Sequence, residues 1–314
     1  MLSVDAVGGG RGSGGTVSRR LVASSAAASS ARGSRGEQQW VVHFSRRWNN
    51  VRITGAGHGI GRELALKYAS LGATVICVDL NPQGNQETVN DVKKLGATAV
   101  HAYECDVSNR DQVFKVAARI KAEVGDVTIL LNNAGIMPSR PFLDTTTEEI
   151  KKIFDINVLA HFWLLQAFLP SMMEKNHGHV VAMSSIAGLV GLPNIVPYCS
   201  SKFAVRGLME AMSEETRQFS KGGQPSGIKF TTIFPYMVDT GLCKNTRIRF
   251  PSLMSMVSPQ EAAAHIVSAQ RRNILESSIP GYWLNINYLL RNFPYAVALG
   301  TADFLNSGVD SDKL

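Results

Sequence analysis

The sequence predicts an α/β fold: a single doubly wound domain in which helices cover both faces of a central parallel sheet. Two apolar runs, VTILLNNAG and GHVVAMSS, end in polar residues, as strands buried on both faces do. Between residues 54 and 78, a glycine-rich turn, a helical apolar stripe and another apolar run predict a strand–helix–strand unit. About 260 residues follow the first fifty, which is enough for one large domain of this class.

Residues 1–48 form a leader of different composition. Its stretch 8–36 is built mainly from Gly, Ser, Ala and Arg, which cannot bury a core, so we expect the leader to be disordered. Its Arg-rich, Ser-rich and acid-poor character is also typical of a mitochondrial transit peptide, although the glycines disfavour an amphipathic helix. No apolar run of eighteen or more residues is present, so the sequence predicts no spanning helix.

The lead-in to the glycine turn is a poor central strand. WNNVRITG offers only Val51 and Ile53 as apolar residues, whereas a strand buried on both faces should be apolar over about five. Arg52 lies between them, and a buried, unpaired arginine would be costly. We hypothesise that residues 1 to about 50 come from an alternative or mispredicted first exon that displaces a native membrane anchor and strand start. Abundant peptides that span the junction within residues 45–60 would contradict this hypothesis.

The turn TGAGHGIG, residues 54–61, predicts a nucleotide site. Gly55, Gly59 and Gly61 let the backbone approach a pyrophosphate, whose charge the N–H groups and the helix dipole stabilise. Asp79 closes the second strand, where a carboxylate can accept hydrogen bonds from both ribose hydroxyls and repel a 2′-phosphate. A strand-end cap is the alternative role for Asp79, and His58 is expected to be a solvated loop residue. NAD is therefore favoured over NADP.

Ser185, Tyr198 and Lys202 have a spacing that can surround one reactive carbon with a hydroxyl, a phenol and an ammonium. Tyr198 and Lys202 share a helix face because they are four residues apart. The ammonium favours the phenolate, so we expect it to lower the tyrosine pKa and make Tyr198 a general acid or base. Ser184 is expected to be structural, since only Ser185 lies thirteen residues before Tyr198. Cys199 points away along the helix and is also expected to be structural.

Together with the CDV of Cys105 to Val107, NNAG at 132–135 and Asn157, these motifs resemble the short-chain dehydrogenase/reductases over residues 51 to about 280. The resemblance implies a Rossmann-type domain at 49–281 with about seven strands, and a homodimer. It implies that Tyr198 is the catalytic acid/base, that Lys202 binds the nicotinamide ribose, that Ser185 orients the substrate oxygen and that Asn157 holds a proton-relay water. A packed, hydrogen-bonded amide is the alternative for Asn157. The cofactor contacts implied are Gly55, Gly59, Ile60, Gly61, Asp79, Asp106, Val107, Asn133, Ala134, Gly135, Tyr198, Lys202 and Val238.

The substrate end of the chain is apolar. The segment 240–258, rich in Met and Leu, corresponds to the family's substrate lid and suits a hydrophobic alcohol, although ordinary packing is an equal alternative. Before it, Tyr236 replaces the glycine that normally follows Pro235, which puts the backbone path there in question. The tail 282–314 is expected to lie on a membrane interface, cover the substrate mouth or pack against the domain.

With YCSSKFAVRGL, the chain is most similar to the retinol dehydrogenase and lipid-droplet 17-beta-hydroxysteroid dehydrogenase branch. This implies NAD-dependent oxidation of a retinoid, steroid or other lipid alcohol to its carbonyl. It also implies a location on the endoplasmic reticulum or lipid droplets, with mitochondria or cytosol as alternatives. Two other functions stay open: an NADPH-dependent carbonyl reductase of the same family, and a non-catalytic nucleotide-binding protein of lipid droplets.

Charge and cysteines exclude other classes of function. The net charge is +7, but the first fifty residues hold seven Arg and no Lys against Asp5 and Glu37, so the remaining chain is nearly neutral. Nucleic-acid binding, which needs a basic face, is therefore not expected. The four cysteines lack metal-site spacing and suit a reducing compartment, so neither a metal centre nor a disulfide framework is expected.

Overall fold

The structure is a computed structural model that describes residues 50–219, 225–251 and 254–312. The leader 1–48, and with it the hypotheses of disorder, of a transit peptide and of a replaced first exon, lies outside the described residues.

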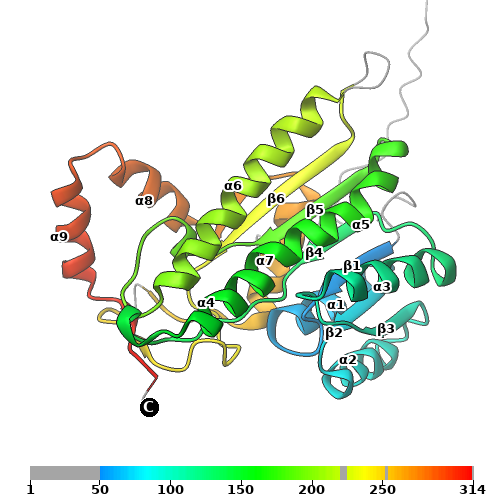
Figure 1. The fold of residues 1–314 in the computed structure, drawn as a ribbon, viewed down its shortest axis with the longest axis horizontal. Helices are drawn as coiled ribbons and strands as arrows, with labels where there is room; N and C mark the ends of the chain where they lie inside the picture. The colour runs from blue at the N-terminus through cyan, green and yellow to red at the C-terminus, as the bar shows by residue number, and fades with distance from the viewer. Residues whose placement is uncertain (1–49, 220–224, 252–253, 313–314) are drawn as a thin grey trace, which may run out of the picture. The chain divides into compact units, whose positions relative to one another are not determined.

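A seven-stranded parallel sheet forms the centre of the fold, in the order β3-β2-β1-β4-β5-β6-β8, which confirms the predicted fold class (Figure 1). The order reverses between β1 and β4, and the carboxyl edge at such a reversal is where doubly wound sheets bind ligands. The strands are β1 (Asn50–Thr54), β2 (Thr74–Asp79), β3 (Val100–Glu104), β4 (Ile129–Asn132), β5 (Gly178–Met183), β6 (Ile228–Pro235) and β8 (Glu276–Ile279).

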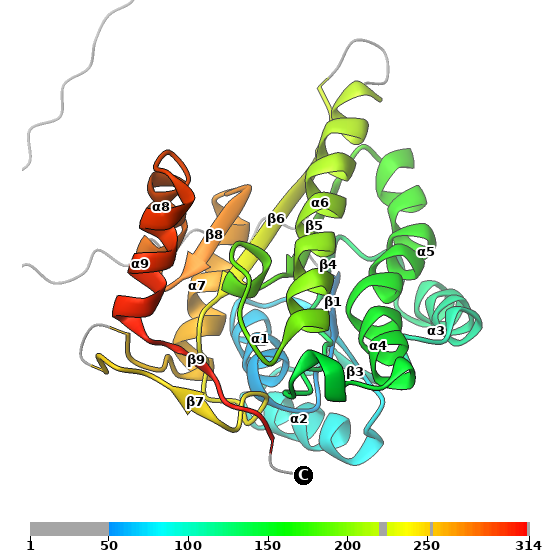
Figure 2. The same cartoon turned by 60° about the vertical axis from the view of Figure 1, so that its left-hand side comes forward.

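Helices pack on both faces of the sheet and enclose two apolar cores (Figure 2). One core contains residues of α1 (Gly59–Ser70), α2 (Pro82–Lys94) and α7 (Pro259–Arg271). The other contains residues of α3 (Arg110–Glu123), α5 (Ala160–Glu174) and α6 (Val196–Gln218). Every residue of β4 and β5 is buried, as the two apolar runs predicted.

The first strand forms in spite of its composition. β1 pairs in parallel register with β2 and β4, and its residues from Val51 to Thr54 are buried. The expectation that this segment makes a poor central strand is therefore wrong as far as its backbone pairing is concerned. The concern about Arg52 is confirmed. Its side chain is fully buried, its guanidinium carbon lies 4.7 Å from the ring centroid of Phe168, and no nitrogen of the guanidinium has a hydrogen-bond partner among the described residues. Burial lowers the pKa of Arg52 to about 10.

One continuous helical stretch, Thr147–Glu174, joins α4 (Thr147–Phe154) to α5 and is long and apolar enough to cross a membrane. This stretch qualifies by its length and by the average hydropathy of a window, whereas the sequence-based expectation concerned an uninterrupted apolar run. Half of its most apolar window is buried inside the domain, and α5 supplies Leu164, Phe168 and Met172 to the core beside the sheet. This packing identifies a core helix of the α/β domain.

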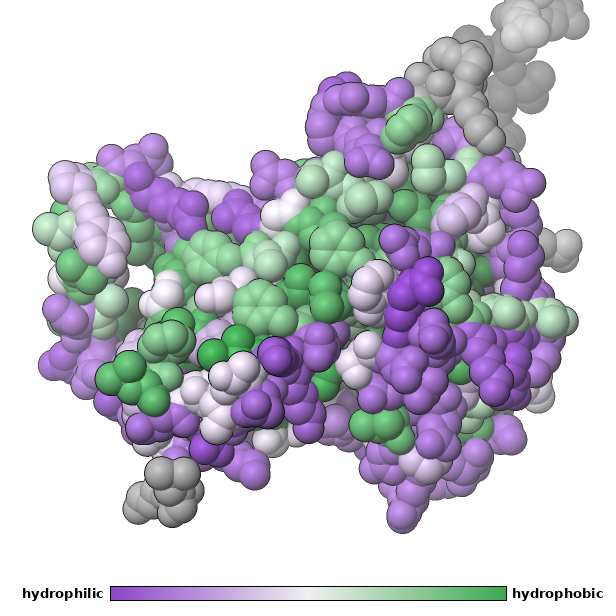
Figure 3. Space-filling model, in the orientation of Figure 1, coloured by the Kyte–Doolittle hydropathy of each residue, from purple (hydrophilic) through white to green (hydrophobic). Residues whose placement is uncertain are grey.

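The tail contributes two further helices, α8 (Tyr282–Leu290) and α9 (Tyr295–Leu305), followed by β9 (Gly308–Val309). β9 pairs antiparallel with β7 (Thr246–Arg247), which lies in the lid segment. No residue of α9 is buried, although eight of its eleven residues are apolar, all except Gly300, Thr301 and Asp303. α9 therefore presents a largely apolar surface at one end of the domain (Figure 3).

A second exposed apolar area lies over α5, α6 and the turn before α5, across the middle of the view in Figure 3. Its exposed large side chains are Leu159, Phe162, Val196 and Phe203.

Candidate active site

A cavity of about 560 Å³ opens at the carboxyl edge of the sheet, between the turn after β1 and the start of α6. Fifteen residues are expected at the site, and thirteen of them line the cavity. The other two, Gly61 and Asn157, are chain neighbours of the lining residues Ile60 and Ile156. The sequence therefore identified one contiguous site.

The turn after β1 has the backbone that its glycines predict. Gly55 and Gly59 have φ angles of 65° and 55°, in the left-handed region that glycine adopts without strain. At Gly61 the reason is space, because a Cβ there would lie 2.0 Å from the Gly55 carbonyl oxygen. A Cβ at Gly57 would approach the Asp79 carboxylate to 3.0 Å. The turn is therefore a backbone cradle that fits a pyrophosphate.

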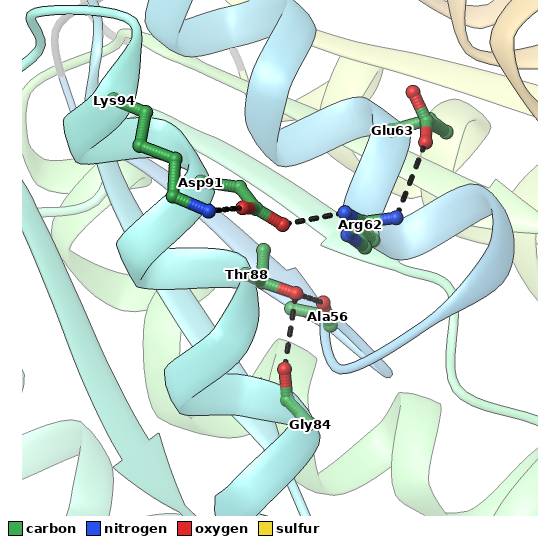
Figure 4. Close-up of polar contacts among 7 residues, drawn as sticks. All are labelled: Ala56, Arg62, Glu63, Gly84, Thr88, Asp91 and Lys94. Atoms are coloured by element: carbon green, nitrogen blue, oxygen red, sulfur yellow. Dashed lines mark hydrogen bonds and ion pairs between the residues drawn. The ribbon is translucent and has the colours of Figure 1, made fainter.

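Helix α2 holds this turn in position (Figure 4). The Thr88 hydroxyl donates to the carbonyl of Ala56 at 2.8 Å, and Arg62 of α1 donates to the Asp91 carboxylate of α2 at 2.5 Å. Lys94 holds the other oxygen of Asp91 at 2.8 Å. These contacts fix the glycine turn against the helix that follows Asp79.

The Asp79 carboxylate lies at the end of β2 and faces the cavity. One oxygen accepts from the Gly57 N–H at 2.7 Å and the other from the Asn81 N–H at 2.8 Å. Both oxygens keep free lone pairs for further donors, which suits a pair of ribose hydroxyls. His58 also lines the cavity, and among the described residues of the lining the one Lys or Arg is Lys202, which belongs to the catalytic group.

The NNAG segment is joined to the glycine turn by Thr54. The Thr54 hydroxyl accepts from the N–H groups of Asn133 at 2.9 Å and Ala134 at 3.1 Å, and the Asn133 amide donates to the Thr54 carbonyl at 2.9 Å. Asp106 and Val107 line the opposite wall, where the Asp106 carboxylate accepts from the N–H and hydroxyl of Ser108.

Ser185, Tyr198 and Lys202 meet at the centre of the cavity. The Ser185 hydroxyl forms a hydrogen bond with the Tyr198 hydroxyl, and it also lies 3.3 Å from the Pro235 carbonyl. The Lys202 ammonium donates to the Met183 carbonyl at 2.8 Å and lies 5.5 Å from the centroid of the Tyr198 ring. Ser184 also lines the cavity, and its hydroxyl donates to the Lys202 carbonyl at 2.8 Å.

The expected lowering of the Tyr198 pKa is wrong for the protein alone. Burial raises the pKa of Tyr198 to about 12, and the hydrogen bond with Ser185 offsets only part of that rise. The Lys202 ammonium lies 5.5 Å from the centroid of the Tyr198 ring, and burial lowers the pKa of Lys202 to about 8. Desolvation of both groups therefore outweighs their mutual attraction.

Asn157 lies in a π-helical turn, Asp155–Leu159, between α4 and α5. Its side-chain oxygen accepts from the Ile136 N–H at 2.9 Å, and its nitrogen donates to the Ile136 carbonyl at 2.9 Å and to the Ser201 hydroxyl at 3.1 Å. Both N–H donors and one lone pair of the oxygen are used, and the amide clamps the loop after β4 to α6. The π-helical turn widens the helix where this clamp is needed.

The remaining wall is apolar and comes from the loops after β4, β5 and β6 and from the tail. It includes Met137, Leu192, Ile195, Leu242 and Val309. Tyr236 also lines the cavity, and its ring centroid lies 5.4 Å from that of Trp283 in α8. Tyr236 stands where the family normally has glycine, and the backbone there still forms a sheet hydrogen bond. The Tyr236 N–H donates to the Ile279 carbonyl at 2.8 Å.

Sequence reasoning missed several residues that build this site. Thr54 is the first residue of the motif TGAGHGIG, and this place at the end of the strand was a sequence signal that could have identified it. Asn81 was also detectable as a helix N-cap before Pro82. Val309 carried no signal, because its place in the site depends on pairing between two-residue strands that are distant in the sequence.

Comparison with known proteins agrees with this geometry. The family model for short chain dehydrogenases matches residues 49–249. The chain is a member of the short-chain dehydrogenase/reductase family. It is 42% identical over 255 residues to epidermal retinol dehydrogenase 2 of Mus musculus, which covers 81% of each chain. It is 41% identical over 243 residues to human 17-beta-hydroxysteroid dehydrogenase 13, which covers 77% of this chain and 78% of that protein.

The solved structure of a short chain dehydrogenase/reductase from Burkholderia phymatum has a TM-score of 0.70 to this family member. At 24% identity, covering 85% of this chain and 99% of that one, it supports the fold alone. The family match and the curated relatives identify an NAD(P)-dependent oxidoreductase that acts on CH–OH donors, in the branch that contains these retinol and hydroxysteroid dehydrogenases.

Proposed function

We propose that this dehydrogenase uses NAD to oxidise a hydrophobic alcohol, a retinoid, a steroid or another lipid alcohol, to its carbonyl. The observation that supports the proposal most is the position of Tyr198. Its hydroxyl lies with that of Ser185 where the cavity passes from the polar glycine turn to the apolar wall of Met137, Leu192 and Ile195. Such a wall favours the carbon skeleton of a lipid alcohol through burial of apolar surface.

In this mechanism Tyr198 removes the hydroxyl proton of the alcohol as general base. Ser185 donates to the substrate oxygen and orients it toward Tyr198, because its hydroxyl already lies within hydrogen-bond distance of the phenol. Lys202 holds positive charge beside the phenolate as it forms, and its own position is fixed by the Met183 carbonyl. A bound nicotinamide supplies the hydride acceptor. The apolar wall excludes water from the reacting carbon.

Asn157 acts in this proposal as a positioning residue. Both donors of its amide nitrogen are used by Ile136 and Ser201, so a relay water binds at the free lone pair of its oxygen or at the Ile136 carbonyl. The clamp on Ile136 keeps the loop after β4 at the distance from α6 that the cavity requires.

The cofactor preference for NAD rests on Asp79. Its carboxylate accepts the two hydroxyls of an adenosine ribose and repels a 2′-phosphate, and the one Lys or Arg among the described residues of the cavity lining is Lys202 of the catalytic group. The cradle at Gly55 to Gly61 and the Asp79 oxygens together fit the pyrophosphate and ribose of NAD.

The test compares wild type with Tyr198→Phe on a panel of retinol, a steroid alcohol and a long-chain alcohol, each with NAD and with NADP. We expect turnover of a hydrophobic alcohol by the wild type with NAD, and at least a 100-fold loss in Tyr198→Phe with unchanged NADH affinity. Appreciable residual turnover in the variant would refute the role of Tyr198, and a preference for NADP would refute the cofactor assignment.

The surface of α8 and α9 is proposed to lie on a phospholipid surface, on the endoplasmic reticulum or a lipid droplet. Leu289 of α8 is 61% exposed, and Tyr295 and Phe304 of α9 are 76% and 62% exposed. Aromatic and aliphatic residues of this kind favour the headgroup boundary. Leu289→Glu should lower the fraction of protein that floats with phosphatidylcholine vesicles. The matched control is Leu95→Glu at the C-cap of α2, where the leucine is 58% exposed. Equal flotation of both variants would contradict the proposal.

A homodimer through α5 and α6 is proposed from the exposed apolar area of Leu159, Phe162, Val196 and Phe203. A second copy would cover these side chains and remove their apolar surface from water. Sedimentation of the wild type and of Phe203→Asp tests it, since the variant should be monomeric at concentrations where the wild type is a dimer. A monomeric wild type would refute the proposal.

A further inference from the structure

We infer that the segment Gly308–Asp312, here called the strap, is a wall of the substrate pocket and that Val309 sets the size of alcohol that the pocket accepts. This inference rests on the proposed function and adds to it a specificity-determining residue. No motif of the sequence points to Val309.

The strap is held by three loops that surround the cavity mouth. Its backbone pairs with the lid through β7 and β9, where the Asp310 N–H also donates to the Asn245 carbonyl at 2.8 Å. From the loop after β5, the Asn194 amide donates to the Val309 carbonyl at 2.9 Å. From the loop after β4, the Ser139 hydroxyl donates to the Asp310 carbonyl at 2.8 Å, and the Asp312 N–H donates to the Ser139 carbonyl at 2.7 Å.

Side chains reinforce the same attachment. Arg247 of β7 lies 3.2 Å from the Asp310 carboxylate, and the Asn245 amide donates to the Asp312 carboxylate at 3.1 Å. The Ser139 N–H donates to the other Asp312 oxygen at 3.3 Å. The loops after β4 and β5 are also joined directly, because the Arg140 N–H donates to the Asn194 carbonyl at 2.8 Å. The strap ties the lid to this pair of loops.

Val309 is the strap residue that lines the cavity beside Tyr198. It is 4% exposed, lines the cavity and packs in one apolar cluster with Ile195, Tyr198 and Cys199. It therefore faces the space beside the phenol that the carbon skeleton of the alcohol must occupy. It does not belong to the polar half of the cavity formed by the glycine turn and Asp79.

Two contrasting substitutions follow from this position. Val309→Trp fills the space beside Tyr198, so large alcohols should be rejected while small ones still reach the phenol. Val309→Ala removes two methyl groups and enlarges the pocket, so bulkier alcohols should bind better. Val297, on α9, is 43% exposed and provides matched Val→Trp and Val→Ala controls away from the cavity.

The experiment measures retinol, estradiol and dodecanol binding by quenching of protein fluorescence, together with kcat and KM for these alcohols and for cyclohexanol. For Val309→Trp we expect binding of the large alcohols to weaken at least 10-fold. NADH affinity and the KM of cyclohexanol should change less than 2-fold. Val297→Trp should behave as the wild type. Melting temperatures identify a misfolded variant, in which case Val309→Leu replaces it and should shift binding in the same direction.

The possible outcomes separate the two proposals. If Val309→Trp changes all alcohols and NADH alike, or leaves retinol binding unchanged, the strap is structural only and the inference is overturned. If the wild type turns over no alcohol but Val309→Trp still weakens binding of the large ones, the inference stands and the proposed reaction fails. If the wild type binds none of the three large alcohols, both proposals are overturned.

Discussion

Replacing the buried Arg52 with leucine should stabilise the protein. The guanidinium is fully buried, and a pKa lowered from 12.5 to about 10 corresponds to roughly 3 kcal/mol of destabilisation of the charged form. Leucine loses the contact with the Phe168 ring, which is worth roughly 1–2 kcal/mol for a desolvated pair, and gains burial of apolar atoms between β2 and β4. We expect a net gain of about 2 kcal/mol, which for a domain of this size raises the melting temperature by roughly 4–8 °C.

The assay is thermal unfolding of wild type, Arg52→Leu and a matched control, followed by circular dichroism. The control is Arg110→Leu, because Arg110 also lies over a ring, 4.5 Å from the centroid of Phe114, but its side chain is 53% exposed. This exposed substitution should change stability by less than about 0.5 kcal/mol. A lower melting temperature in Arg52→Leu than in wild type would refute the reasoning, because it would mean that the guanidinium has a stabilising partner in the fold.

Three further predictions follow from the site. Asp79→Ser removes the carboxylate that accepts from the Gly57 and Asn81 N–H groups, and with it the charge that repels a 2′-phosphate. In fluorescence titrations the affinity for NAD should fall roughly 10–100-fold and the affinity for NADP should rise. Gly61→Ala places a Cβ 2.0 Å from the Gly55 carbonyl oxygen and should abolish NADH binding. The control is Gly207→Ala, in open space on α6, which should stabilise the folded protein by about 1 kcal/mol. Normal NADH binding by Gly61→Ala would contradict the packing argument. Lys202→Met should be inactive but more stable, because burial lowers the pKa of Lys202 to about 8 and the folded state therefore binds the proton less tightly than the unfolded state. The gain is complete below pH 8 and disappears as the pH rises toward 10.5, so melting temperatures at pH 7 and pH 10 that show the same gain would refute it.

The sequence predicted the fold and the polar half of the site because both depend on local patterns. Apolar runs predict β4 and β5. The glycines of the turn after β1 indicate backbone angles and close approaches that a side chain would not allow. Spacing along one helix was enough to bring Tyr198 and Lys202 to one face.

The features that could not be predicted depend on contacts between distant segments. β1 forms because β2 and β4 supply hydrogen-bond partners on both of its edges, which compensates for a composition that no local rule favours. The pKa of Tyr198 depends on burial by the surrounding loops, which a rule about two neighbouring side chains omits. Likewise β7 and β9 are two residues each, too short for any periodicity, and they lie about sixty residues apart.

The strap also has a consequence for synthesis of the chain on the ribosome. All seven strands of the sheet precede Pro280, so the glycine turn, Asp79 and Tyr198 can assemble before the strap has left the exit tunnel. Val309 and Asp310 arrive afterwards and attach to loops that are already folded. A polypeptide cut by a protease between α9 and β9 would therefore keep a folded sheet and its tyrosine, while it loses the part that selects among alcohols.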